Sequence, residues 1–138
     1  MTLPQDAGGA PRRVELVFYR TEPKKEYLET LRRLAHFPHD NKTWLGPGHT
    51  MPNGIPPVKL WGGAVLDTFL FMPPIVNRDR SLPTELVLLG DPVQFLQVVP
   101  LSTPECNLKL EKGFDAILDL FDEHRHPHVF DPNRRSYV

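Results

Sequence analysis

The chain has 138 residues, of which 40% are hydrophobic and 24% charged, and its 16 basic and 17 acidic side chains give a formal net charge of −1. This size and composition are those of a single folded domain with one hydrophobic core. The near balance of charge excludes a strong field of either sign, so composition gives no argument for nucleic acid or an anionic membrane as a partner.

Cysteine usage and the N-terminal sequence indicate the compartment. Cys106 is the only cysteine, so no disulfide forms within the chain, and a lone thiol fits a reducing environment. Residues 1–11 are rich in glycine and proline and lack the basic start and apolar stretch of a signal peptide. No apolar run approaches the ~20 residues that span a bilayer. We therefore expect a cytoplasmic protein with a flexible leader over residues 1–11.

The first predicted elements are a strand and a helix. The run V-E-L-V-F-Y over residues 14–19 is β-branched and aromatic, which favours a strand. In the helix that follows, apolar residues recur at spacings of four, three and three: Tyr27, Leu31, Leu34 and Phe37. We expect Thr21 to cap this helix and Pro38 to end it.

Residues 38–57 are predicted to be mostly loop because they are rich in proline and glycine. Asn53-Gly54 indicates a tight turn, since both residues tolerate positive φ. Trp44 and Met51 are expected to anchor the loop apolarly. His49 and Asn53 allow two interpretations: they contact a partner, or they bond neighbouring backbone and hold the loop together.

The second half of the sequence is predicted to contain three strands and a helical region. A strand over 65–72 is followed by a polar connection over 75–83 and then by a hairpin with arms over 85–89 and 93–99. Ser102 or Thr103 is expected to cap a helical stretch over 104–124, with Glu105 completing a capping box, and Gly113 either divides or weakens this helix. The resulting fold class is α/β (α+β), with a single mixed or largely antiparallel sheet and helices packed against it.

The sequence shows no motif for catalysis. It lacks a phosphate-binding glycine-rich loop and a G-x-S-x-G elbow, and Cys106 falls on the apolar face of a helix. Six histidines form two groups interrupted by prolines: His36, His39 and His49, then His124, His126 and His128. We therefore predict no catalytic, cofactor-binding or metal-binding residue and no cofactor. A metal-assisted hydrolase that uses the histidine-rich loop remains the alternative.

Several strings in the chain resemble the suppressor-of-fused domain family in its small bacterial form. They are L-R-R-L-A-H-F-P-H-D-N-K-T-W-L-G-P-G-H-T-M-P-N-G-I-P-P over 31–57, L-D-T-F-L-F-M-P-P over 66–74, V-Q-F-L-Q-V-V-P-L over 93–101, E-C-N-L-K-L-E-K-G-F-D-A-I-L-D-L-F-D over 105–122, and D-P-N-R over 131–134. The resemblance implies one such domain over residues 12–138.

The resemblance also implies a function. Members of this family bind other proteins, and many bacterial members look like immunity proteins that neutralise a toxin, so we expect a non-enzymatic module with a toxin or a regulatory protein as its partner. The candidate partner-binding loop comprises Trp44, Gly46, His49, Pro52, Asn53 and Gly54. The C-terminal signature comprises Glu105, Asp131 and Arg134. For Asp131 and Arg134 a salt bridge that fixes the tail is favoured over a partner contact.

Family members usually begin with further strand-forming sequence ahead of the point where Met1 falls here. We expect the missing strands to leave one sheet edge exposed, which offers a route to a homodimer or to a structural assembly through residues 14–19. Size-exclusion chromatography tests this expectation, because a compact monomer at high concentration would contradict it.

Overall fold

The computed structural model describes residues 13–74 and 86–138. The expected leader over 1–11 and the whole of the predicted connection over 75–83 lie outside these residues. The elements, in chain order, are β1 (Arg13–Val17), α1 (Lys25–Asp40), β2 (Thr50–Pro52), the 3-10 helix η1 (Leu60–Gly62), β3 (Leu66–Met72), β4 (Val87–Leu88), β5 (Asp91–Ser102), α2 (Thr103–Lys112) and α3 (Phe114–Glu123).

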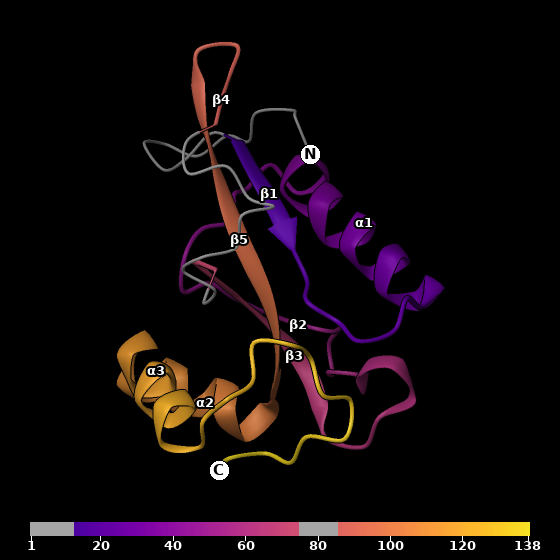
Figure 1. The fold of residues 1–138 in the computed structure, drawn as a ribbon, viewed down its shortest axis with the longest axis vertical. Coiled ribbons are helices and arrows are strands. Elements are labelled where there is room, and N and C mark those ends of the chain that lie inside the picture. Colours follow the sequence, from indigo (N-terminus) through magenta and orange to yellow (C-terminus); the bar gives the residue numbers. More distant parts are fainter. Residues whose placement is uncertain (1–12, 75–85) are drawn as a thin grey trace. The chain divides into compact units, whose positions relative to one another are not determined.

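The strands form one five-stranded sheet in the order β1-β5-β3-β2, and β4 pairs with β5 (Figure 1). β1 runs parallel to β5, with Val14 opposite Gln94. The pairs β2–β3 and β4–β5 are antiparallel. The sheet is therefore mixed, and the predicted fold class is confirmed.

The chain forms two compact units. Within the described residues, the first unit comprises 13–18, 22–49, 71–74 and 86–98, and the second comprises 19–21, 50–70 and 99–138. Strands β3 and β5 contribute residues to both units.

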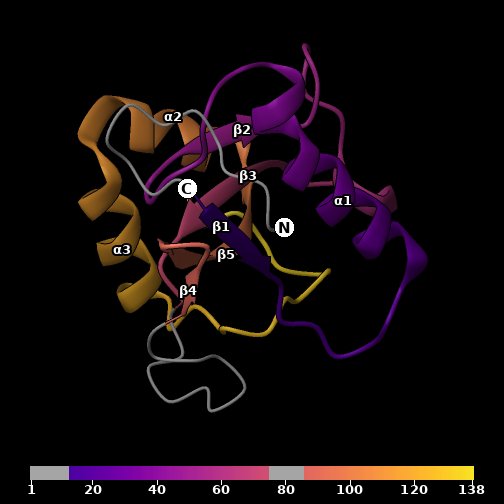
Figure 2. The ribbon, with the colours of Figure 1, turned by 90° about the horizontal axis from the view of Figure 1, so that it is seen from above.

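In the first unit, α1 lies beside β1 in both views (Figures 1 and 2). Tyr27 and Leu34 of its apolar stripe are buried, and the Tyr27 ring meets Phe18 edge to face at 5.3 Å. Two predictions about its ends were wrong: the N-cap is Lys24, and the helix continues through Pro38 to Asp40. A proline in the last turn removes only one intrahelical hydrogen bond, and that turn still closes through Asn41 N–H to Phe37 O at 3.0 Å.

The predicted hairpin is confirmed, but its turn lies one residue earlier than expected. Leu89 and Gly90 are its two central residues, with φ of 50° and 84°. Asp91 belongs to β5, where its carboxylate accepts a hydrogen bond from Arg13 Nε at 3.1 Å. This ion pair links the neighbouring strands β1 and β5, and Asp91 pairs with Leu88 across the hairpin.

In the second unit, α2 begins as predicted. Ser102 is its N-cap, Glu105 N–H donates to Ser102 Oγ at 3.3 Å, and Ser102 N–H donates to Glu105 Oε2 at 2.9 Å. Gly113, with φ of 92°, divides the helical region into α2 and α3, which pack together. Cys106 is half-buried and so does not belong to the fully buried core.

β2 is a strand inside the predicted loop and was missed. Its three residues pair with β3, placing Met51 opposite Phe69. No local pattern indicates so short a strand, because the partner that stabilises it lies 18 residues away. The buried apolar side chains of this unit come mainly from β3, β5 and α3: Leu60, Leu66, Phe69, Leu70, Val99, Leu101, Ile117 and Phe121.

Candidate functional site

Three of the predicted loop residues pack together in the first unit. The rings of Trp44 and His49 lie 4.5 Å apart, and Gly46 N–H donates to His49 Nδ1 at 3.2 Å. A Cβ atom on Gly46 would come within 2.5 Å of the Trp44 ring, so only glycine fits without displacing that ring. His49 is therefore bound to its own loop, and the main chain beside it is fixed as well, since Phe71 N–H donates to His49 O at 2.9 Å.

The remaining three, Pro52, Asn53 and Gly54, belong to the second unit. Here residues 53–58 form a loop, called the 53–58 loop, whose two ends are joined by hydrogen bonds. Asn53 Nδ2 donates to Val58 O at 2.8 Å, and Val58 N–H donates to Asn53 O at 2.8 Å. Gly54 follows with φ of +94°, a conformation that glycine adopts without strain. The turn spans more residues than the tight turn that Asn53-Gly54 predicted.

The outer part of the 53–58 loop is apolar and exposed. Ile55 is 95% exposed and Val58 62%, and the two prolines between them are exposed as well. The exposure of the Ile55 side chain was not predicted from the sequence. The position of Ile55 between Asn-Gly and Pro-Pro, two pairs that favour turns, is the signal that could have indicated this exposure.

The C-terminal signature residues belong to the second unit, where two of them form a buried ion pair. Arg134 Nη1 donates to Glu105 Oε1 at 2.7 Å, and Nη2 donates to Oε2 at 2.8 Å. Arg134 also donates to Pro100 O at 2.8 Å, and Tyr137 N–H donates to Glu105 Oε1 at 2.9 Å. Burial alone would raise the pKa of Glu105, but the hydrogen bonds and charge of Arg134, with the N–H groups of Tyr137 and Ser102, lower it below its usual value.

Asp131 plays a different role from its signature neighbours. Its carboxylate accepts a hydrogen bond from Asn133 N–H at 2.9 Å, and its carbonyl accepts from Arg134 N–H at 3.2 Å. The predicted tail-fixing salt bridge between Asp131 and Arg134 was wrong, because Glu105 is the acid that pairs with Arg134. An exposed Asp131 in a turn keeps its hydration, whereas the fully buried Glu105 carboxylate requires a cation beside it.

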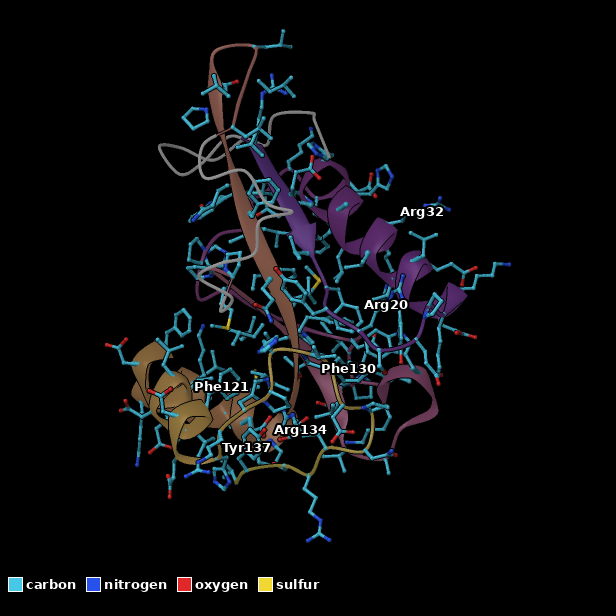
Figure 3. All side chains as sticks on the ribbon, viewed as in Figure 1. Arg20, Arg32, Phe121, Phe130, Arg134 and Tyr137 are labelled. Atoms are coloured by element: carbon cyan, nitrogen blue, oxygen red, sulfur yellow. The ribbon has the colours of Figure 1, made fainter. Side chains whose placement is uncertain are left out.

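An aromatic cluster beside this ion pair was not predicted. His126 stacks on Phe121 at 4.2 Å, and its Nδ1 lies 2.8 Å from Tyr137 Oη. Phe121 and Tyr137 are labelled in Figure 3. Arg134 lies over the Tyr137 ring at 4.4 Å. Burial, aided by the positive charge of Arg134, lowers the pKa of His126 to about 4, so this imidazole is neutral at pH 7. Burial raises the pKa of Tyr137.

Within residues 13–74 and 86–138, no three or more His, Cys, Asp or Glu side chains are grouped so that they could hold a metal ion. His49 and His126, one from each predicted histidine group, contact Gly46 and Tyr137 instead. No helix among these residues is long and apolar enough to cross a membrane.

One family model matches almost the whole chain. The model of the family described as suppressor of fused protein (SUFU) matches residues 1–135. The chain belongs to the suppressor of fused family. No curated protein matches the chain.

The fold of this suppressor of fused protein also resembles a solved structure. A SUFU homologue from Neisseria gonorrhoeae FA 1090 matches with a TM-score of 0.68 and 20% sequence identity, over 91% of this chain and 63% of the homologue. At this identity the likeness shows the fold alone. The chain spans less than two thirds of the length of that homologue.

Proposed function

We propose that this suppressor of fused protein is a non-enzymatic, cytoplasmic protein-binding module whose contact surface includes the 53–58 loop. The observation that carries the proposal is the 95% exposure of Ile55 on a loop closed by two Asn53–Val58 hydrogen bonds. An apolar side chain gains free energy when a partner removes it from water. A loop already fixed by its own hydrogen bonds loses little conformational entropy on binding.

The composition of the loop supports a protein partner over a nucleic acid. The sequence N-G-I-P-P-V over 53–58 contains no charged residue. Binding to a phosphate backbone depends on Lys and Arg, whereas protein interfaces have apolar, charge-poor centres. The finer proposal rests on the resemblance of the chain to a family in which many bacterial members look like immunity proteins. It is that the partner is a toxin that this chain neutralises; the alternative partner is a regulatory protein.

The test begins with affinity purification of the tagged protein from its native host, with mass spectrometry of stoichiometric partners. The same experiment is then run on Ile55→Ser and Val58→Ser. Leu110→Ser is the matched control, because Leu110 is an exposed aliphatic residue of the same unit, on α2. We expect the two loop variants to lose the partner and the control to retain it.

The immunity proposal has its own readout. If the partner is lethal when expressed alone, co-expression of the parent chain restores growth and co-expression of Ile55→Ser does not. Retention of every stoichiometric partner by both loop variants would exclude the 53–58 loop as the contact surface. A chain that purifies alone or as a homo-oligomer under several growth conditions contradicts the proposal of a separate partner.

A further inference from the structure

Both ends of the 53–58 loop attach to one residue of β3, Asp67. At the start of the loop, Asn53 N–H donates to the main-chain oxygen of Asp67 at 2.8 Å. Immediately after its end, Lys59 Nζ donates to the carboxylate oxygen Oδ2 of Asp67 at 3.0 Å. All of these residues belong to the second unit. The main chain and the side chain of a single residue therefore fix the two points between which the loop projects.

Asp67 is itself held in place by two further side chains. It is only 2% exposed, and Thr103 Oγ1, at the start of α2, donates to its Oδ2 at 2.7 Å. Thr68 Oγ1 donates to its Oδ1 at 3.1 Å. Burial alone would raise the pKa of Asp67, but the hydrogen bonds from Thr103, Lys59 and Thr68 and the charge of Lys59 lower it below its usual value. The carboxylate therefore stays ionised at pH 7.

Stability of β3 alone does not explain an aspartate at this position. Asp67 stands in a strand whose seven residues are all buried, among them Phe69 and Leu70. Lys59, its ion-pair partner, is half-exposed, and an ion pair that water reaches contributes little to stability. The contribution of the Asp67 carboxylate is directional, because it binds the lysine that follows the loop and a threonine from α2 at defined points.

We propose that Asp67 is a positioning residue, which holds the 53–58 loop in the conformation that presents Ile55 and Val58. The functional meaning rests on the proposed protein-binding role of the loop. The structural claim does not, because the order of the loop can be measured without any partner.

The experiment is residue-resolved amide hydrogen exchange by NMR on the full chain. Lys59→Met removes the charge contact from the loop side, and Lys59 is a half-exposed side chain whose loss leaves the core intact. Asp67→Asn removes the same contact from the β3 side but keeps the main-chain oxygen that Asn53 uses. Lys112→Met, an exposed lysine of the same unit, is the control. The reporters are the amides of Asn53 and Val58, with those of Gly113 and His124 as references elsewhere in the unit.

In Lys59→Met we expect exchange at Asn53 and Val58 to accelerate up to about fivefold, because the lost ion pair is half-exposed, with Gly113 and His124 unchanged. Asp67→Asn is expected to accelerate exchange at Val58 more than at Asn53. Unchanged exchange at both loop amides overturns the proposal, and so does equal acceleration at all four, which would assign Asp67 to the stability of the whole unit. If the loop loosens while Ile55→Ser still retains the partner, positioning stands and the binding surface is wrong.

Discussion

Arg134 and Glu105 form a bidentate ion pair across 29 residues of sequence, with N–O distances of 2.7 and 2.8 Å. Neither side chain is more than 4% exposed. The pair joins the C-terminal segment to the first turn of α2, where Glu105 already closes the capping box with Ser102. One carboxylate therefore serves both the start of a helix and the attachment of the tail.

Replacing Arg134 by methionine is expected to destabilise the second unit by about 3–5 kcal/mol, because it leaves the Glu105 carboxylate buried without its cation. Urea denaturation followed by circular dichroism measures this change. The adjacent, exposed Arg135→Met is the control and should change the free energy of unfolding by less than about 0.5 kcal/mol. A Glu105→Met/Arg134→Met double variant should lose less than Arg134→Met alone; a larger loss would contradict this account.

His126 makes the stability of the protein dependent on pH in a defined window. Its pKa is about 4 in the folded chain against an ordinary value of 6.5, so between these values the unfolded chain binds a proton that the folded chain does not. Stability should therefore be greatest above pH 6.5 and fall towards pH 4, with a contribution from this residue of up to about 3 kcal/mol. Thermal or urea unfolding at pH 4.5, 5.5 and 7 measures the slope.

The variant His126→Phe isolates this effect, because phenylalanine keeps the stack on Phe121 and cannot take up a proton. We expect a flatter profile between pH 4.5 and 6.5 than that of the parent chain. Parallel profiles for the two proteins would show that other groups cause the slope.

Gly46→Ala should disturb the packing of Trp44 in the first unit. The added Cβ would lie 2.5 Å from the Trp44 ring, which must move and lose its contact with His49. We expect a destabilisation of about 1–3 kcal/mol, as for other overpacked sites. The emission of Trp44, recorded in a Trp61→Phe background because the chain has 2 tryptophans, should shift to longer wavelength. An unchanged spectrum and stability would mean that the ring accommodates the methyl group without cost.

Leu89→Asn is expected to stabilise the β4–β5 hairpin. Leu89 is 86% exposed with φ of +50°, and it precedes Gly90 in a two-residue turn. Asn-Gly is the favoured pair for such a turn, and relief of the leucine strain should contribute about 0.5–1 kcal/mol. Leu110→Asn, at an exposed leucine on a helix, should give no gain. A lower melting temperature for Leu89→Asn would refute the prediction.

The family and the mixed sheet were predictable from sequence, and so were the boundaries that local chemistry fixes. Ser102, Pro104 and Glu105 specify the start of α2 among themselves, and Gly113 specifies its end, because capping groups and positive φ act within a few residues. The hairpin was predictable for the same reason. The role of Asn53 was identified only as one of two alternatives, since its hydrogen bond to Val58 depends on how the whole loop closes.

Features that depend on distant partners were decided by the tertiary structure. The sequence placed Arg134 beside Asp131, but the structure pairs it with Glu105, because only the folded tail brings the guanidinium to the one carboxylate that is fully buried. No role was predicted for Asp67, a polar residue within an apolar strand. Its contacts depend on the folded chain, which brings Asn53, Lys59 and Thr103 within hydrogen-bond distance of it. The sequence alone determined the family, most of the segments and the cap of α2, because these depend on neighbouring residues. Long-range electrostatics and burial, which require the chain to be folded, decided which residues hold the loop and the tail.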